Sequence, residues 1–171
     1  MEASDKLYDR LIRPIEHQMI RIVGRITRNT EEAEDVFQEI LAVIWARLDK
    51  IDKHPNPHAY ILRICVTRSY DALRKRTRRR RFEVFLENIK AKFLLTHTSD
   101  FTKDYDRRSA IRKAIAMLPP NQGQTVLLRL IDETPYQKIG SILGCSEATA
   151  RSHFSKGKAR LRKLLAGMNV I

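Results

Sequence analysis

The chain has 171 residues, of which 43% are hydrophobic and 31% are charged, and its formal net charge is +13. This composition is typical of a folded chain, and the length suits one large domain or two small ones. No apolar run is long enough to cross a bilayer, and the N-terminus lacks the basic start and apolar stretch of a signal peptide. Membrane insertion and secretion are therefore not expected, and the predicted location is the cytoplasm.

The positive charge is concentrated in two blocks. Residues 1–81 carry 18 basic and 12 acidic side chains, residues 82–106 carry 3 and 5, and residues 107–171 carry 12 and 3. Two cationic blocks around a slightly acidic middle favour a long polyanion held at two places, because each neutralised phosphate releases counterions. A basic surface can equally be solubilising or face a membrane, so the partner has to be inferred from geometry.

Cysteine and histidine form no metal-binding or redox pattern. Cys65 and Cys145 lie far apart within apolar stretches, and the five histidines are scattered without a cysteine or carboxylate at ligand spacing. Neither a disulfide nor a zinc site is expected, and both thiols are predicted to be reduced and buried as small hydrophobic groups. No metal and no cofactor is predicted.

The first half of the chain has helical periodicity. Apolar residues that return every three or four positions predict one helix over residues 5–27. The next helix begins at Asn29 or Thr30 and carries an apolar stripe from Ala33 to Leu48. The stretch "KHPNPH" interrupts the pattern with two prolines, and a third helix is predicted from about His58 into the arginines that follow.

The second half of the chain also has helical periodicity, after a break. Periodicity weakens over residues 82–106, which is typical of a linker, and resumes over 107–118 until two prolines stop it. Another helix is predicted over 120–131, because proline is tolerated at the first helical position. The predicted fold is therefore all-α, with small helical domains at 1–81 and 107–171 joined by a flexible linker at 82–106.

A helix pair is predicted between residues 134 and 165. Thr134 is expected to cap the first helix, with Pro135 at its first position. Gly140 allows a second helix to cross closely, and Gly144 ends the first helix with a positive φ. Ser146 then caps the second helix, so the joint has the length of a DNA-binding helix-turn-helix.

The second helix of this pair is rich in cations. Residues 147–163 contain one acidic and six basic side chains. In one interpretation they form a solvated face of an ordinary helical corner, and in the other they form a recognition helix for duplex DNA. Small or hydrogen-bonding side chains suit base edges and favour the second interpretation. The candidate readers are Thr149, Arg151, Ser152, Ser155, Lys156 and Arg160.

A second basic cluster lies upstream, with seven bases in the eight positions from 74 to 81. Alone, such a run is often a nonspecific tail or a solvated helix end. Here it extends a helix that carries Arg63, so a grip on the DNA backbone is plausible. The polar and aromatic groups Asn56, His58 and Tyr60 near the proline-bounded loop could stack on, or hydrogen-bond to, an unpaired base. Alternatively, the two prolines only form a rigid turn and His58 is a solvated cap.

Three segments together resemble a known family. "EEAEDVFQEILAVIWARL" resembles the "AEDLvQevF" helix of bacterial RNA polymerase sigma factors of the extracytoplasmic-function (ECF) type, in the sigma-70 family. "AYILRICVTRSYDALRKR" is similar to the next conserved helix of that family. "LPPNQGQTVLLRLIDETPYQKIGSILGCSEATARSHFSKGKARLRKLL" is similar to its C-terminal domain. The segments occur in the family's order and span nearly the whole chain.

The resemblance implies a role for each segment. Asp35, Gln38 and Glu39 correspond to the surface that binds the clamp helices of the polymerase β′ subunit, which accounts for an acidic patch in a basic protein. Residues 53–76 correspond to the part that opens and reads the −10 promoter element, and 147–160 to the reader of the −35 element. The expected partners are core RNA polymerase (β′ clamp helices and β flap) and promoter DNA, and an anti-sigma factor or another recruiter is a further candidate. The −10 and backbone candidates are Asn56, His58, Tyr60, Arg63, Thr67, Arg74, Lys75, Arg76 and Arg78.

Three positions depart from the family pattern. Tyr60 stands where the family usually has tryptophan, Thr67 where it often has asparagine, and Lys138 where it usually has glutamate. These changes bear on which promoter is read.

Two other functions compete with that of a sigma factor without enzyme activity. A helix-turn-helix regulator that acts without polymerase would not need the acidic helix. An enzyme acting on nucleic acid finds no support, because the sequence has no P-loop, zinc-ligand set or carboxylate cluster.

Overall fold

The structure is a computed structural model that describes the backbone of residues 2–27, 30–94 and 103–168, and the side chains of 6–27, 30–83 and 109–168. All regular structure in these residues is helical. The helices are α1 (Glu2–Leu11), α2 (Glu16–Thr27), α3 (Thr30–Trp45), α4 (Leu48–Asp52), α5 (Pro57–Leu94), α6 (Lys103–Ala116), α7 (Pro120–Leu130), α8 (Tyr136–Leu143) and α9 (Glu147–Gly167), with a 3-10 turn at Arg13–Ile15. The all-α prediction is confirmed.

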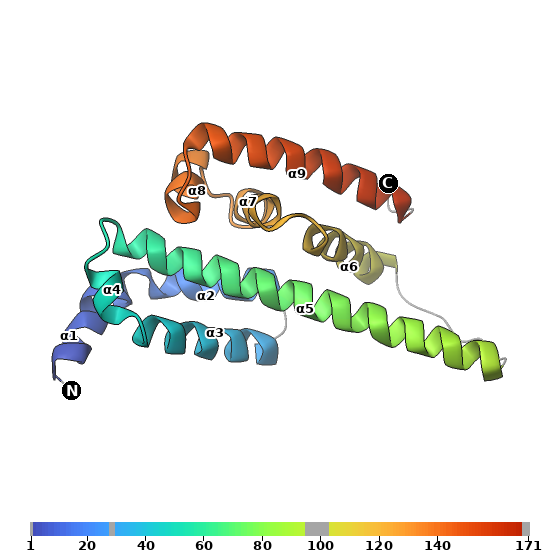
Figure 1. Ribbon diagram of the computed structural model, residues 1–171, viewed down its shortest axis with the longest axis horizontal. Coiled ribbons are helices and arrows are strands. Elements are labelled where there is room, and N and C mark those ends of the chain that lie inside the picture. Colours follow the sequence, from blue (N-terminus) through green and yellow to red (C-terminus); the bar gives the residue numbers. More distant parts are fainter. Residues whose placement is uncertain (1, 28–29, 95–102, 169–171) are drawn as a thin grey trace.

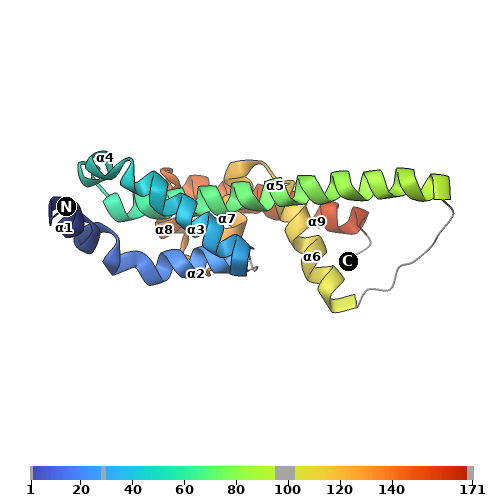
Figure 2. The same ribbon diagram turned by 90° about the horizontal axis from the view of Figure 1, so that it is seen from below.

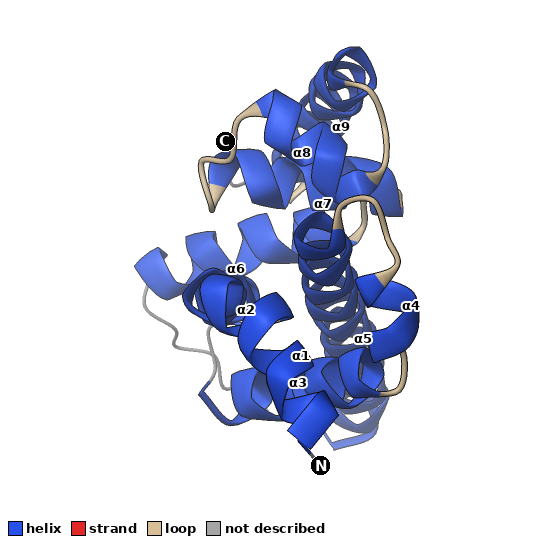
Figure 3. Cartoon of the chain, turned by 90° about the vertical axis from the view of Figure 1, so that its left-hand side faces the viewer, coloured by secondary structure: helices blue, strands red, loops and turns tan. Residues whose placement is uncertain are grey.

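Helix α5 is the central element of the fold. It has 38 residues and, at 1.5 Å per residue, a length of roughly 57 Å. The N-terminal helices α1–α4 pack along one side of its first half, and the C-terminal helices α6–α9 lie on the other side (Figure 1). The end-on view shows α5 between the two groups (Figure 3). The last turns of α5 extend beyond the rest of the bundle (Figure 2). We call α1–α5 the N-terminal domain and α6–α9 the C-terminal domain.

Apolar periodicity correctly predicted the inner face of α3. Val36, Ile40 and Ile44 are buried, while Asp35 and Glu39 on the opposite side are exposed. This alternation is the 3.6-residue period of an amphipathic helix. In the part of the chain that the structure describes, no helix combines the length and the apolar character needed to span a membrane.

The helix predicted over residues 5–27 is in fact two helices. It breaks at Pro14, which lies in the 3-10 turn between α1 and α2. Proline has no backbone N–H, and its ring clashes with the preceding turn of an α-helix. The N–H of Ile15 donates to the carbonyl of Ile12 instead, at 3.0 Å. The single-helix prediction was wrong because the apolar period continues across the break.

Two helix ends also differ from prediction. Helix α3 ends at Trp45, and Leu48 begins the separate α4, although it is buried as expected. The exposed indole of Trp45 stacks on the ring of Tyr8, with 5.9 Å between ring centroids. Helix α5 continues to Leu94 through the first part of the predicted linker. Residues 95–102 lie outside the described part of the chain, and the boundaries at 81 and 106 remain predictions.

The helix-turn-helix joint follows the sequence closely at its centre. Gly144 has a φ of 71°, and the hydroxyl of Ser146 accepts a hydrogen bond from the backbone N–H of Thr149 at 3.1 Å. The first helix, however, begins at Tyr136 and has Pro135 at its N-cap position. The predicted Thr134 cap is wrong, because that hydroxyl donates to the Asp132 carboxylate at 2.8 Å.

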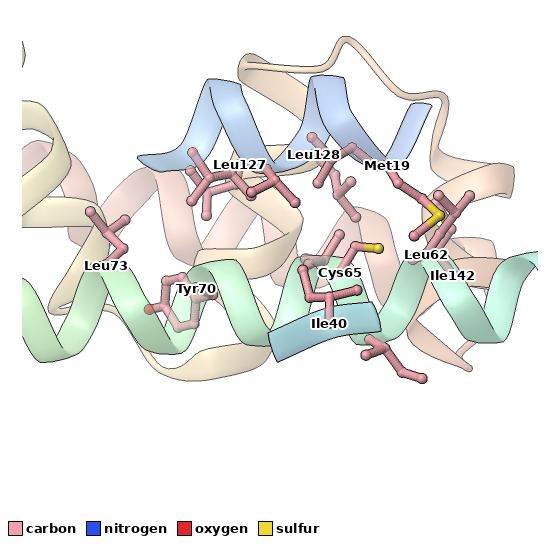
Figure 4. Packing of buried hydrophobic residues seen from close by; sticks show 14 of the residues in the cluster. Met19, Ile40, Leu62, Cys65, Tyr70, Leu73, Leu127, Leu128 and Ile142 are labelled. Carbon is pink, nitrogen blue, oxygen red and sulfur yellow. The ribbon is translucent and has the colours of Figure 1, made fainter. Parts of the chain in front are cut away.

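The two domains pack directly on each other. Leu127 and Leu128 of α7 are buried in one continuous hydrophobic cluster with Met19 of α2 and Cys65 of α5 (Figure 4). Burial raises the pKa of the Cys65 thiol to about 12, so it behaves as the predicted small hydrophobic group. Helix α5 is therefore buried on two sides, which no periodicity argument had predicted.

The crossing of α8 and α9 gives a stability prediction. A Cβ added at Gly140 would lie 2.7 Å from the carbonyl oxygen of Cys145, so Gly140→Ala should force the joint apart. We expect unfolding free energy to fall by about 1–3 kcal/mol, as for other overpacked sites, measured by urea denaturation. Gly167→Ala is the matched control, because its Cβ meets nothing within 4 Å. Equal stability of the two variants would contradict the close crossing.

Candidate nucleic-acid interface

Helix α9 is held by its inner face and leaves its outer face open. Ala150, Gly157, Leu161 and Leu165 are buried. A Cβ at Gly157 would lie 2.8 Å from the Val126 side chain of α7, so these helices approach closely. The edge-on contact of Tyr136 with Phe154, at 5.7 Å between ring centroids, joins α8 to α9. The outer face of α9 therefore has a fixed orientation relative to α8.

The six predicted readers of duplex DNA are all exposed on α9. Successive residues of an α-helix are rotated by about 100°. Ser152, Ser155 and Lys156 therefore occupy the middle of the outer face. Arg151 lies on one flank, and Thr149 and Arg160 lie on the other. The outer face thus presents hydroxyl and cationic groups over roughly half of the helix circumference.

Three of these readers already have partners within the chain. Arg151 donates to the Glu147 carboxylate at 2.6 Å and lies over the ring of Tyr136, at 4.7 Å from its centroid. The Thr149 hydroxyl is 2.8 Å from that of Ser146, and Arg160 donates to the Gln122 side chain at 3.2 Å. The Arg151 pair is exposed and therefore contributes little stability. A base edge could replace Glu147 at small energetic cost.

The structure separates the −10 candidates onto two sides of α5. Tyr60, Arg63 and Thr67 line one pocket, together with Val43, Arg47, Ile64, Arg68 and Asp71. Residues spaced by three and four share a helix face, so these side chains lie along one line. The pocket opens between α5 and α3 and combines aromatic, cationic and hydroxyl groups. Such a combination can stack on a base and contact its phosphate.

Asn56 and His58 lie elsewhere. They line a different pocket, opposite Gln137, Lys138 and Ser141 of α8. The Asn56 side chain accepts a hydrogen bond from the backbone N–H of Ala59 at 3.1 Å, so Asn56 caps the start of α5. The cap is therefore Asn56 and not His58. Tyr60 contacts the ring of His54 at 4.9 Å between centroids, which connects the loop to the first pocket.

The basic side chains of the cluster at positions 74–81 also differ in their surroundings. Arg74, Lys75 and Arg78 are exposed and line a groove with Arg81 and Met117. Arg76 instead donates to the Glu32 carboxylate of α3 at 2.7 Å and is only partly exposed. The first three are available to phosphates, whereas Arg76 joins α5 to α3.

The predicted polymerase surface is exposed on α3. Asp35, Gln38 and Glu39 all face solvent. Asp35 and Glu39 also line a groove with the α5 cations Arg68, Lys75 and Arg79, among other residues. The acidic patch therefore lies beside the basic helix rather than away from it. Side chains of both charges therefore line this groove.

Sequence reasoning missed some side chains of the first α5 pocket as binding candidates. Arg47 follows the end of α3, and Asp71 is on the same α5 face as Tyr60 and Thr67. The spacing 60, 64, 67, 71 is a helical stripe and could have identified Asp71. Arg47 could not have been found in this way, because its place depends on how α3 packs on α5.

Comparison with known proteins agrees with this arrangement. Residues 11–79 match the family Sigma-70 region 2, and residues 108–161 match Sigma-70, region 4. The chain is 23% identical to the RNA polymerase sigma-E factor of Streptomyces coelicolor, over 95% of this chain and 88% of that protein. It is 25% identical to the ECF RNA polymerase sigma factor SigE of Mycolicibacterium smegmatis, over 96% of this chain and 64% of that protein.

A solved structure shares the fold. The sigma factor RpoE from Bartonella quintana, in complex with the anti-sigma factor NepR, superposes with a TM-score of 0.51 and 22% sequence identity. The match covers 93% of this chain and 96% of that one. The two family regions occur in order, one within the N-terminal domain and the other within the C-terminal domain. The chain therefore belongs to the extracytoplasmic-function group of the sigma-70 family, whose partners are core RNA polymerase and promoter DNA.

Proposed function

We propose that this chain binds core RNA polymerase through α3 and directs initiation by reading −35 DNA with α9 and −10 DNA beside α5. In this proposal residues 1–81 act as region 2, residues 82–106 connect, and residues 107–171 act as region 4. The observation that carries it is the pocket of Tyr60, Arg63 and Thr67 in one domain, combined with an exposed recognition helix in the other. The chain acts in the cytoplasm and has no enzyme activity of its own.

The two DNA contacts have different chemistry. The outer face of α9 offers cations and hydroxyl groups at the start of a helix, which suits base edges in the major groove. The α5 pocket offers the ring of Tyr60 and nearby cations, which suits an unstacked base. We include an anti-sigma factor among the proposed partners, since RpoE of B. quintana, which has the same fold, forms a complex with NepR.

The function is tested by transcription in vitro with core polymerase and a library of promoter fragments. We expect a defined set of promoters to be enriched, and the variant Asp35→Lys/Glu39→Lys to lose both core binding and transcription. Both side chains are exposed on α3, so the fold should survive. Asp49→Lys, an exposed reversal in α4, is the control and should be active. Promoter binding without any response to polymerase would favour a polymerase-independent regulator instead.

The recognition helix is tested by two alanine variants. Arg151 and Lys158 are seven residues apart and share a flank of α9, but only Arg151 is in the part that meets base edges. Arg151→Ala should weaken binding to the preferred −35 duplex by about 1–3 kcal/mol and relax selectivity at one position. Lys158→Ala should weaken binding to all sequences alike. An equal, uniform loss in fluorescence anisotropy titrations of both variants would mean that α9 holds only the backbone.

The −10 pocket is tested by Tyr60→Ala. Stacking of one base on an aromatic ring is worth about 1–3 kcal/mol, so promoter opening by the holoenzyme should fall by a corresponding factor. Tyr60→Phe should retain most of the opening, and −35 binding should be unchanged in both variants. Opening is measured by permanganate reactivity of the melted strand. A defect in His58→Ala as large as that in Tyr60→Ala would place the base on the other side of α5.

A further inference from the structure

The pocket beside Tyr60 is too long to be filled by one base. Tyr60, Thr67 and Asp71 all line it, and they follow one face of α5. At 1.5 Å per residue, the distance from Tyr60 to Asp71 along the helix axis is roughly 16 Å. This distance exceeds the length of a nucleobase. A base that stacks on Tyr60 therefore leaves Thr67 and Asp71 free to meet a different base.

The ring of Tyr60 is held at its own end of the pocket. It contacts the ring of His54 at 4.9 Å between centroids, and the Nδ1 atom of His54 accepts a hydrogen bond from the backbone N–H of Asn56 at 3.1 Å. The loop thus fixes the histidine, and the histidine restrains the tyrosine ring. Tyr60 cannot move along the pocket toward Asp71 without losing this contact.

The hydroxyl group of Thr67 differs from those of other helical threonines. Thr27, Thr77 and Thr125 each donate to the carbonyl oxygen four residues earlier, at 2.9, 2.9 and 2.6 Å. Thr67 is partly exposed, and its hydroxyl makes no such bond within the residues that the structure describes. This hydroxyl is therefore available to a partner from outside the chain.

Asp71 is the acidic residue among those that line this pocket, and its carboxylate forms no ion pair with any described residue. Arg68 and Lys75 are three and four positions away from it. Elsewhere in the chain such spacing does produce a pair, as between Arg79 and Glu83 at 2.9 Å. A carboxylate that only offset the charge of its neighbours would be expected to pair in the same way. The oxygens of Asp71 are instead free to accept hydrogen bonds from a ligand.

Asp71 also lies where the pocket meets the basic groove. It lines that groove together with Arg74, Lys75 and Arg78. The phosphates next to a base at Asp71 can therefore be bound by these cations. A strand that runs along α5 from Tyr60 passes Asp71 before it reaches the strongest positive potential.

A carboxylate and a hydroxyl group together suit a base that carries an amino group. A carboxylate only accepts hydrogen bonds, and it matches the N4 amino group of cytosine or the N6 amino group of adenine. Guanine also carries an amino group, at N2. Thymine has none, and its ring N–H lies between two carbonyl oxygens, which a carboxylate repels. The threonine hydroxyl can donate or accept, so it can complete the pairing with each of the other three bases.

We propose that Thr67 and Asp71 form a second base-reading position in this pocket, separate from the base stacked on Tyr60, which accepts adenine, cytosine or guanine and disfavours thymine. The inference rests on the proposed function, to which it adds one promoter position and the class of base read there. The asparagine that the family often has at position 67 can form two hydrogen bonds with adenine. Threonine cannot, so the selective role passes to the acceptor, Asp71.

The test uses the holoenzyme and promoters in which each unpaired position of the −10 non-template strand is varied in turn. At one position we expect thymine to lower the amount of open complex at least about fivefold relative to the best base. Asp71→Asn should remove most of this penalty, because an amide can donate to a carbonyl oxygen of thymine. Thr67→Val should weaken the selection and Thr67→Ser should restore it. Asp49→Asn, an exposed change in α4 outside the pocket, is the control and should keep the full penalty.

The contact itself is tested by removing the amino group from the favoured base, with purine for adenine, 2-pyrimidinone for cytosine or hypoxanthine for guanine. The wild-type holoenzyme should lose about as much as with thymine, whereas Asp71→Ala should bind both forms alike. Tyr60→Ala should keep the thymine penalty at this position, since its ring meets another base. If Asp71→Asn strengthens binding to all four bases equally, Asp71 only lowers the positive potential and the proposal is wrong.

A second assay separates this inference from the function on which it rests. The same full-length proteins are titrated without polymerase, by fluorescence anisotropy, with single strands that differ in one base. Open complexes that form without a thymine penalty overturn the inference and leave the proposed function intact. Failure to open any promoter, together with an Asp71-dependent penalty in the titrations, does the reverse. If neither assay shows the penalty, the inference fails.

Discussion

Helix α5 has two hydrophobic sides that must both be covered, and the rest of the fold depends on how they are covered. Ile61 and Cys65 belong to the same buried cluster as α2 and α3, and Tyr70 carries the cluster to α6 and α7. A helix that is apolar on two sides is stable only when both sides are covered. Separation of the domains would therefore expose apolar surface on α5.

Positive charge is distributed unevenly along the same helix. The first turns carry few cations and border the Tyr60 pocket, while positions 74–81 are almost entirely basic. Asp35 and Glu39 lie beside these cations and lower the local positive potential. A polyanion therefore meets its strongest field away from α3, which leaves the acidic helix accessible to a basic protein surface. Charges of both signs thus line one groove between α3 and α5.

The sequence correctly predicted those helix ends that depend only on neighbouring residues. Gly144 and Ser146 were placed correctly, because a left-handed C-terminus and an N-cap are set within a few residues. The break at Pro14 was missed because the apolar spacing is preserved across it, and Thr134 was misplaced because its hydroxyl had a nearby carboxylate as an alternative partner. The contact between Tyr70 and Gly123 joins residues 53 positions apart, and no periodicity encodes it. The division of the −10 candidates between two sides of α5 depends on the same long-range packing.

The stacking of Trp45 on Tyr8 has a practical consequence. Trp45 is the single tryptophan of the chain, and it lies at the end of the helix that carries the acidic patch. Its indole is 41% exposed, so its emission responds to changes at that surface as well as to loss of the stacked ring. Indole fluorescence therefore records the N-terminal domain alone, whereas circular dichroism records the helices of both. The difference between the two unfolding curves measures how strongly the shared core couples one domain to the other.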